Sequence, residues 1–318
     1  MKEKEIVLGV DIGGTNTKIG LVTRKGEVIK ESSFKTGAKE PFEKFIAEFE
    51  KQVNDLLQQA GKEYKFIAIG IGAPNANYKS GCMEHPPNFR WGDSIPVVEK
   101  VKKIFNLPVS FTNDANAAAL GELEFGAGKG MKNFVVLTLG TGLGSGIILD
   151  GKLLQGEHGM AGEIGHISVN PEGRMCNCGL QGCLETYASV TGIKRTVFEM
   201  IAEMRDDSDL RSISFNEMTG LTIADAALNG DIIAKNAFEF TGNILGLKIA
   251  DVVAVLDPEA IILTGGLTKA GDILLKPTKK SMEKNLFKAY KGKINLLIST
   301  MTGSDAVRGA AALAWNEM

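Results

Sequence analysis

The chain has little net charge, no long apolar run and only four cysteines, and each of these shortages excludes a class of protein. A formal net charge of -2 lacks the basic excess typical of nucleic-acid binders, so we expect no nucleic-acid partner. The longest apolar stretches are interrupted by glycine and are shorter than a membrane-spanning helix, so we expect no membrane partner. The charged first residues lead straight into a strand pattern and do not resemble a signal peptide.

The length and composition are those of an ordinary globular protein with a substantial core. At 318 residues we expect two domains. Because no low-complexity segment or obvious linker divides the chain, these domains should share several chain crossings. Three of the four cysteines fall between residues 176 and 183. Clustered cysteines without an export signal favour metal binding over disulfides, and hence a reducing, cytoplasmic compartment.

The first part of the chain shows alternating strand and helix patterns. An apolar run at 6–10, a glycine turn at 11–15 and a polar–apolar alternation through residue 22 predict two strands joined by a tight turn. The further elements expected here are a strand near residue 28, an amphipathic helix at 40–60, a buried strand at 66–71, a long loop at 73–93, a strand at 109–112 and a helix that begins at 113–114.

A second strand–turn–strand pattern at 134–149 echoes the first, down to the tight turn Asp150-Gly151 that follows it. A weak duplication of this kind implies two similar halves that face each other. From residue 191 the chain is expected to be mostly helical, with a buried helix at 231–256, strands at 260–264 and 294–298, and a last helix at 305–315.

One histidine and the clustered cysteines supply the donors of a metal site. The set consists of Cys176, Cys178, Cys183 and, ten residues upstream of the first cysteine, His166. Three thiolates and an imidazole are what a closed tetrahedral zinc site requires. The alternative is three unrelated core cysteines and a satisfied core histidine, and the close spacing favours ligation.

Carboxylates lie beside this cluster at both ends, at Glu163 and Glu185. A metal that holds two carboxylates and a histidine around one point suggests a site for a polyhydroxylated ligand. If one nitrogen of His166 binds the metal, the other is fixed in one tautomer and can hydrogen-bond a sugar hydroxyl.

Glycine-rich turns suggest a bound phosphate. In Asp11-Ile12-Gly13-Gly14-Thr15 the glycines let backbone N–H groups approach an anion, Thr15 adds a hydroxyl, and Asp11 can hold a hydrated magnesium ion. Alone, this would equally be a plain hairpin turn. Gly140-Thr141-Gly142-Leu143-Gly144 and Thr264-Gly265-Gly266 are further turns of this type, and together they favour a nucleotide held between two domains. The dinucleotide-binding spacing of glycines is absent.

Asn113-Asp114 directly follows an apolar strand. An aspartate at such an edge can accept a proton from a substrate hydroxyl, and the asparagine amide can orient the same ligand. The alternative is a helix cap, because Asn and Asp are both favoured at that position.

Over essentially its whole length the chain resembles the repressor–open-reading-frame–kinase (ROK) family of sugar kinases, and its glucokinases most. The motifs that carry the resemblance are 11–15, Asn113-Asp114-Ala115-Asn116, 139–144, Gly159-x-Ala161-Gly162-Glu163-x-Gly165-His166, Cys176-x-Cys178-Gly179-x-x-Gly182-Cys183-x-Glu185 and 264–266. The glycine turns alone belong to the wider actin-like ATPase superfamily, whereas the zinc cluster with the Glu163–His166 motif is specific to this family.

The resemblance implies a two-domain α/β, actin-like ATPase (ribonuclease-H-like) fold with a cleft between the domains. Residues 1–113 with 303–318 would form a small domain, and 114–302 a large one that carries the zinc-binding loop. The implied reaction is the ATP- and Mg²⁺-dependent phosphorylation of a hexose at its 6-hydroxyl, with glucose as the first expected substrate. Such a reaction belongs to carbohydrate metabolism and, for glucose, to glycolysis. Chain length and long helices make a homodimer the expected assembly.

The resemblance also assigns residues. The implied sugar contacts are Asn113, Asp114, Glu163, His166 and Glu185, with Asp114 as the catalytic base. The implied ATP-binding residues are Asp11, Gly13, Gly14, Thr15, Thr138, Gly140, Thr141, Gly142, Gly265 and Gly266. Zinc would be held by His166, Cys176, Cys178 and Cys183, and its loss is expected to weaken sugar binding while the glycine turns still bind nucleotide.

The chain departs from the family pattern at one position. Two functions other than a glucokinase also stay open. Asn75 follows Gly72-Ala73-Pro74 where many family kinases have glycine, and asparagine tolerates the left-handed conformation needed there. One alternative is a kinase for N-acetylmannosamine, N-acetylglucosamine, fructose or allose. The other is a sugar-sensing transcriptional regulator, which the early first strand and the presence of Asp114 disfavour.

Overall fold

The computed structural model describes residues 4–86, 89–301 and 305–318. Residue 303, one of the expected domain boundaries, lies outside the described residues. Contacts divide the chain into two compact units. The first comprises Met1–Lys132, Gly146–Gly162 and Thr300–Met318, and the second Asn133–Ser145 and Glu163–Ser299. This division places residues 114–132 and 146–162 with the N-terminal part, whereas the domains expected from the sequence, 1–113 with 303–318 and 114–302, stay a prediction.

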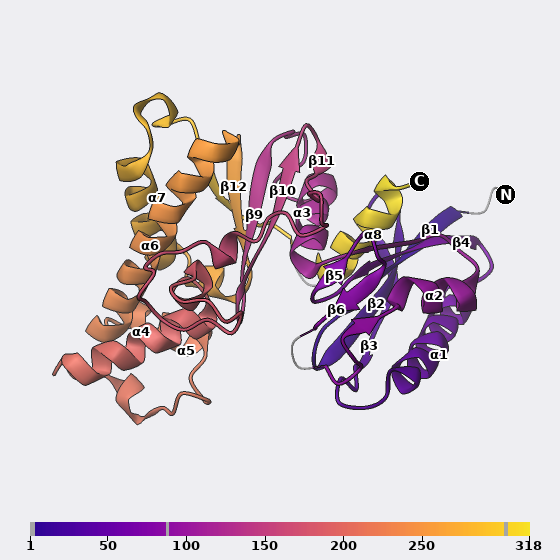
Figure 1. Cartoon of the computed structure of the whole chain (residues 1–318), viewed down its shortest axis with the longest axis horizontal. Helices are drawn as coiled ribbons and strands as arrows, with labels where there is room; N and C mark the ends of the chain where they lie inside the picture. The colour runs from indigo at the N-terminus through magenta and orange to yellow at the C-terminus, as the bar shows by residue number, and fades with distance from the viewer. Residues whose placement is uncertain (1–3, 87–88, 302–304) are drawn as a thin grey trace. The chain divides into compact units, whose positions relative to one another are not determined.

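The first unit is built on a five-stranded sheet of order β3-β2-β1-β4-β8 (Figure 1). Its strands are β1 (Lys4–Ile12), β2 (Asn16–Thr23), β3 (Val28–Lys35), β4 (Tyr64–Gly72) and β8 (Val109–Thr112). β1 pairs antiparallel with β2 and parallel with β4, which in turn pairs parallel with β8. The carboxyl ends of β1, β4 and β8 therefore lie at one edge of the sheet, where ligands of open α/β sheets commonly bind.

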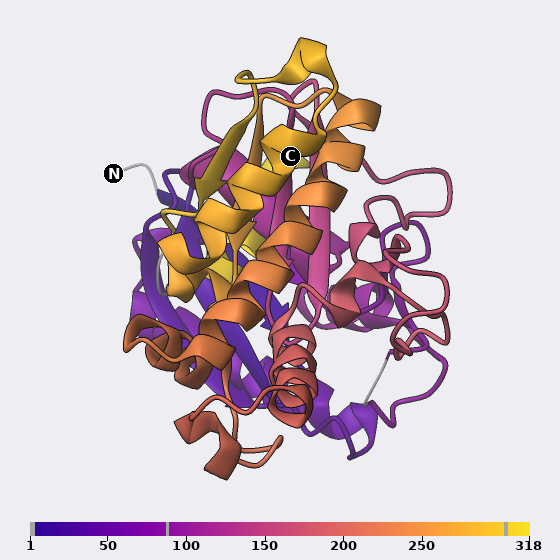
Figure 2. The ribbon, with the colours of Figure 1, turned by 90° about the vertical axis from the view of Figure 1, so that its left-hand side faces the viewer.

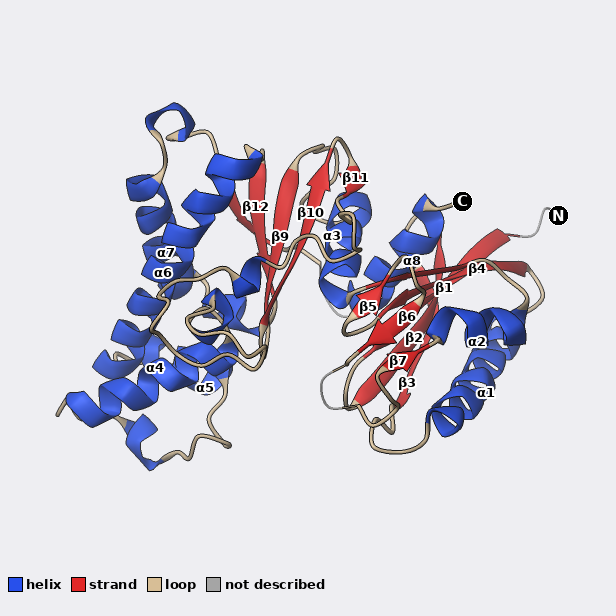
Figure 3. Cartoon of the chain, in the orientation of Figure 1, coloured by secondary structure: helices blue, strands red, loops and turns tan. Residues whose placement is uncertain are grey.

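Helices cover both faces of this sheet (Figure 3). On one face, α1 (Phe42–Ala60) and α2 (Val97–Phe105) bury apolar residues against the strands. On the other face, α8 (Asp305–Asn316) packs closely on β1 and β4. Glycines permit this approach, because a Cβ at Gly9 or Gly70 would lie 2.0 or 1.8 Å from a carbonyl oxygen of α8.

The second five-stranded sheet repeats the strand order of the first, as β11-β10-β9-β12-β13. Its strands are β9 (Phe134–Leu139), β10 (Leu143–Leu149), β11 (Lys152–Leu153), β12 (Ala260–Thr264) and β13 (Asn295–Ile298). β12 is parallel to both β9 and β13, as β4 is to β1 and β8. The chain passes from the second unit to the first within β10. The duplication expected from the sequence is thus confirmed by the topology.

The helices of the second unit are α4 (Val190–Glu203), α5 (Gly220–Leu228), α6 (Ile232–Leu256) and α7 (Asp272–Asn285). α6 and α7 pack along each other, and Figure 2 shows them side by side in orange. As expected from its composition, α6 is buried along much of its circumference, including Phe238, Leu245 and Ile249. Within the described ranges, none of the helices has both the length and the apolar character required to cross a membrane.

Three features differ from the sequence-based expectations. The segment 73–93, expected as a loop, contains β5 (Ala76–Asn77) and β6 (Cys82–Glu84), which join β7 (Ser94–Ile95) in a small sheet. Strands of two or three residues are too short to show an alternation of apolar and polar residues in the sequence. The helix α2 and the helix α7 were not anticipated, and α7 contains Pro277, which ordinarily argues against a helix interior. The remaining element of the first unit is α3 (Asp114–Phe125), which begins where it was expected.

Candidate functional site

Asp11 and Asp114 lie at the same edge of the first sheet. Asp11 stands at the carboxyl end of β1, and Asp114 is the first residue of α3, directly after β8. Asn113 is the N-cap of α3, and its side-chain oxygen accepts the N–H of Asn116 at 2.7 Å. The capping alternative is therefore confirmed for the oxygen of Asn113, which leaves its amide N–H groups as donors for a ligand.

The environment at this edge favours the protonated form of both carboxyl groups. Burial and the charge of Asp114, opposed by Lys18, raise the pKa of Asp11 from 3.8 to about 6. Asp114 is exposed at the molecular surface, although many protein atoms surround its carboxyl group. This burial raises the pKa of Asp114, although its carboxylate accepts the N–H of Ala115 at 2.8 Å, which acts in the opposite direction. Paired, perturbed carboxyls at a sheet edge are typical of functional sites.

Two threonines hold the first glycine turn in place. The N–H of Gly13 donates to the carbonyl of Asn16 at 3.1 Å, and the Thr36 hydroxyl donates to the carbonyl of Gly13 at 2.7 Å. Thr36 also exchanges a hydrogen bond of 2.9 Å with the buried hydroxyl of Thr17. Gly14 faces open space, so its backbone is approachable by a ligand. No local sequence pattern indicated Thr17 or Thr36, whose hydroxyl groups support the turn through these hydrogen bonds.

Asn75 adopts the left-handed conformation considered for it, with φ of 49°. Its side-chain amide donates to the carbonyls of Glu84 and His85, at 3.1 and 3.0 Å. This asparagine thus ties the end of β4 to the strand β6. The segment between them is anchored further by Lys79, whose ammonium group binds both the carbonyl and the carboxylate of Glu157.

The candidate nucleotide residues of the second unit meet at the carboxyl ends of β9 and β12. Thr138 and Thr264 are paired neighbours in these strands. Gly265 has φ of 97°, and a Cβ there would lie 2.6 Å from the backbone of Leu139, so glycine is required. The hydroxyl oxygen of Thr138 is buried and has no partner in the structure. An unpartnered hydroxyl at this edge fits the ligand-binding role expected for Thr138.

The donors of the expected metal site are brought together. The four ligand atoms of His166, Cys176, Cys178 and Cys183 all lie within 4.8 Å of one another. The Sγ atoms of Cys178 and Cys183 are 3.7 Å apart, and Sγ of Cys176 is 3.8 Å from Nδ1 of His166. Ligands about 2.3 Å from a tetrahedral zinc ion are roughly 3.8 Å apart, so the residues fit zinc. The four cysteines of the chain form no disulfide.

The thiols of the cluster differ in acidity. Burial and hydrogen bonds from the neighbouring thiols raise the pKa of Cys183 to about 12, and burial also raises that of Cys176. Burial acts in the same direction on Cys178, but hydrogen bonds from the backbone of Leu180 and from Cys176 outweigh it and lower its pKa.

The two glutamates occupy different surroundings. Glu163 is the N-cap of the 3₁₀ helix η1 (Ile164–His166), and its side chain is 49% exposed, with Oε2 3.9 Å from Nε2 of His166. Glu185 lies in the 3₁₀ helix η2 (Leu184–Thr186) and is half-buried. Its Oε2 accepts the N–H of Leu143 at 2.9 Å, and its Oε1 is 3.7 Å from Sγ of Cys176. Sequence reasoning placed Glu185 beside the metal ligands but missed its bond to the glycine turn.

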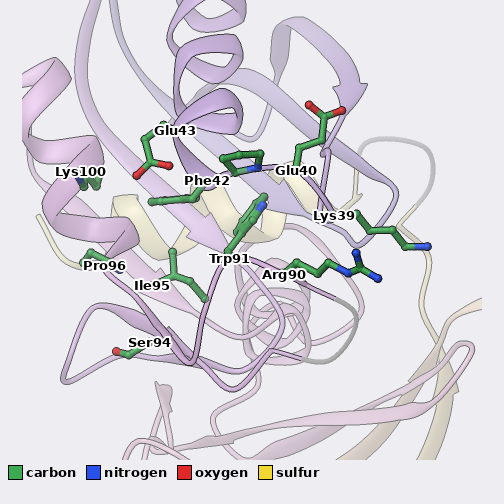
Figure 4. A pocket seen from close by; sticks show the side chains of 11 residues that line it. Lys39, Glu40, Phe42, Glu43, Arg90, Trp91, Ser94, Ile95, Pro96 and Lys100 are labelled. Atoms are coloured by element: carbon green, nitrogen blue, oxygen red, sulfur yellow. The ribbon is translucent and has the colours of Figure 1, made fainter.

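The candidate residues form one group in each unit. The first unit holds Asp11, Gly13, Gly14, Thr15, Asn113 and Asp114, and the second holds Thr138, Gly140, Thr141, Gly142, Glu163, His166, Cys176, Cys178, Cys183, Glu185, Gly265 and Gly266. A surface cavity of ≈ 640 Å³ lies elsewhere in the first unit, between Phe42, Trp91 and Ile95, with Lys39 and Arg90 at one end (Figure 4). It is lined by none of the candidate residues.

Comparison with known proteins places the similarity in one family. A family model described as the ROK family matches residues 7–317. A glucokinase of Halalkalibacterium halodurans is 38% identical over 305 residues, covering 94% of this chain and 91% of the relative. A crystal structure of a ROK family glucokinase from Streptomyces griseus, in complex with glucose and AMPPNP, superposes with a TM-score of 0.80 at 33% identity, covering 98% of this chain and 99% of that one. A xylose repressor of Caldicellulosiruptor bescii is 30% identical, covering 100% of this chain and 80% of the relative.

Proposed function

The chain belongs to the ROK family and has its actin-like ATPase fold, and we propose that it is an ATP-dependent kinase that phosphorylates the 6-hydroxyl of a hexose, glucose first. The observation that carries the proposal is the position of Asp114, a carboxylate at the start of α3 beside Asp11. Similarity to a glucokinase that binds glucose and AMPPNP supports both substrates.

In this proposal Asp114 is the general base. Its carboxylate accepts the proton of the 6-hydroxyl while that oxygen attacks the γ-phosphorus of ATP, and ADP leaves. A base is most effective when its pKa lies near the working pH, and burial moves the pKa of Asp114 in that direction. Asn113 donates its amide N–H groups to the same sugar. Phosphoryl transfer otherwise requires mainly positioning and stabilisation of charge.

The two glycine turns would hold the nucleotide. Backbone N–H groups at 13–15 and 140–142 suit phosphate oxygens, and Gly265-Gly266 would lie against the adenosine. Magnesium bound with ATP neutralises part of the phosphate charge, and Asp11 would hold its hydration shell. The hydroxyl of Thr138, buried without a partner, would find one on the nucleotide.

Zinc would be held by the histidine and the three cysteines. It would fix the ring of His166 by Nδ1 and leave Nε2 for the sugar, next to Glu163. Because Glu163 and Glu185, which are proposed to bind the sugar, lie beside the cluster, its occupancy should affect sugar affinity. The homodimer and the cytoplasmic location remain predictions.

A second candidate function is sugar sensing without turnover. The full-length similarity to a xylose repressor is the observation that favours it. Such a protein would bind a sugar but release no ADP. The kinase and the sensor therefore differ in whether a sugar causes ADP release from ATP.

A coupled ADP-release assay across a sugar panel tests the proposal. The panel contains glucose, N-acetylmannosamine, N-acetylglucosamine, fructose, allose and xylose, each with Mg–ATP, and the Asp114→Asn variant serves as control. We expect glucose-dependent ADP release that the variant lacks. Release with another sugar at a far higher rate would correct the substrate, and sugar binding without ADP release from any sugar would favour the sensor.

A further inference from the structure

Glu185 connects the metal cluster to the glycine turn at residues 140–142. Its Oε2 accepts the N–H of Leu143, the first residue after that turn, at 2.9 Å. Its Oε1 lies 3.7 Å from Sγ of Cys176. One carboxylate thus contacts a metal-ligand residue with one oxygen and the nucleotide turn with the other.

The turn is shaped to receive this carboxylate. A Cβ at Gly142 would lie 2.2 Å from Oε2 of Glu185, far inside contact distance. The φ of Gly142 is not in the left-handed region, so a larger residue there would meet mainly the side chain of Glu185 and would push its carboxylate away from the turn. The turn and the carboxylate therefore fit each other as one packed structure.

The backbone on the carboxyl side of Glu185 forms a second connection. The carbonyl of Glu185 accepts the hydroxyl of Ser189 at 2.7 Å, and Ser189 in turn caps α4 by accepting the N–H of Gly192 at 3.0 Å. The next residue, Val190, donates its N–H to the carbonyl of Gly140 at 2.9 Å. The first turn of α4 thus holds the glycine turn from the other side.

The metal ligands fix the position of Glu185 itself. Cys183 is the N-cap of η2, and its carbonyl accepts both the N–H and the hydroxyl of Thr186, at 2.9 and 2.7 Å. The bridge between Ser168 and Cys183 ties this segment to the one that follows His166. A metal that joins His166 to Cys183 would therefore hold η2, and with it Glu185, in register with the turn.

We propose that Glu185 is a positioning residue through which the histidine–cysteine cluster maintains the nucleotide-binding shape of the turn at residues 140–142. Metal loss then weakens nucleotide binding as well as sugar binding. This differs from the expectation from sequence that the glycine turns bind nucleotide independently of the cluster. The inference rests on the proposed function, since it takes the turn to bind a nucleotide.

The test measures the affinity for Mg–AMPPNP by calorimetry, without sugar, and zinc content by atomic absorption. Wild-type protein is compared before and after dialysis against a chelator, alongside Glu185→Ala, Glu185→Gln and Cys178→Ala, each checked for folding by circular dichroism. Glu172→Ala is the matched control, because Glu172 is an exposed glutamate between His166 and Cys176 and belongs to neither proposed binding site.

We expect chelation, Cys178→Ala and Glu185→Ala each to weaken Mg–AMPPNP binding by about 10-fold. Glu185→Gln, which keeps an acceptor for the N–H of Leu143, should retain most of the affinity, and Glu172→Ala should match the wild type. Chelation of Glu185→Ala should add little further loss, because both changes break the same connection. Hydrogen exchange at residues 139–144 should rise in the metal-free wild type.

Two results would overturn the inference in distinguishable ways. If the wild type binds Mg–AMPPNP and folded Glu185→Ala or metal-free protein binds it within about twofold as tightly, the connection through Glu185 is wrong and the proposed kinase stands. If wild-type protein with full zinc content does not bind Mg–AMPPNP, the proposed kinase fails, and the inference fails with it.

Discussion

Replacing Asp11 by asparagine should stabilise the fold while it impairs nucleotide binding. Burial and the charge of Asp114 raise the pKa of Asp11 from 3.8 to about 6 in the folded chain, against the opposing effect of Lys18. About two units correspond to roughly 3 kcal/mol of unfavourable free energy for the ionised group. Solvent screening reduces this figure, so we expect Asp11→Asn to gain about 1–2 kcal/mol in the free energy of unfolding at pH 7.5.

The gain should depend on pH in a defined direction. Because the folded chain binds the Asp11 proton more tightly than the unfolded chain, this carboxyl group favours folding below pH 3.8. That contribution is lost as the pH rises from 3.8 to about 6. Asparagine has no proton to lose, so the advantage of Asp11→Asn should be small near pH 4.5, grow through this window and level off above pH 6.

Urea denaturation at pH 4.5, 5.5 and 7.5, followed by circular dichroism, measures this difference. Asp55→Asn, on the exposed face of α1, is the matched control and should change stability by no more than about 0.5 kcal/mol. Calorimetry with Mg–AMPPNP should show weaker binding for Asp11→Asn alone. A variant no more stable than the wild type at pH 7.5, or a gain that is equal at all three pH values, would refute the reasoning.

Four further outcomes are expected. Asp114→Asn should lower turnover by about 10²–10⁴-fold with little change in glucose affinity, and turnover within a few-fold of the wild type would rule out the base. The kcat/KM for glucose should fall on acidification through a pKa above 3.8, since burial raises that of Asp114, and a flat profile down to pH 4 would contradict this. Cys178→Ala should lose zinc, melt at a lower temperature and bind glucose about 10–100-fold more weakly, whereas unchanged glucose affinity after zinc loss would make the metal a remote structural element. Glucose, with its free 2-hydroxyl, should outperform N-acetylmannosamine in the sugar panel, and the reverse would exclude a glucokinase.

Sequence patterns located the long elements and the motif residues. The apolar runs at 6–10 and 134–139 correspond to β1 and β9, and the periodicity at 40–60 corresponds to α1. The repeated pattern at 134–149 predicted two similar halves, and the two sheets do share a strand order. These predictions succeed because burial on one face or both imposes a period on the residues.

Other features depend on contacts between distant residues and leave no local signal. Pro277 obscured α7, which α6 stabilises by packing along it. Thr36, which directly follows β3, supports the first glycine turn although it lies 23 residues away from Gly13 in the sequence. The hydrogen bond between Glu185 and Leu143 joins residues that are 42 positions apart in the sequence. The same carboxylate also contacts the thiol of Cys176. The motif marked Glu185 as a candidate functional residue, but only the fold shows that it contacts the backbone directly after the glycine turn at residues 140–142.

The proposed reaction transfers the γ-phosphoryl group of ATP to the 6-hydroxyl of a hexose with Asp114 as base. Phosphorus and proton nuclear magnetic resonance of a reaction with glucose, ATP and Mg²⁺ identifies the product directly. We expect one phosphomonoester at carbon 6 of glucose for each ADP formed, and its loss in Asp114→Asn. ADP accompanied by inorganic phosphate alone, or an equal yield of sugar phosphate from Asp114→Asn, would contradict it.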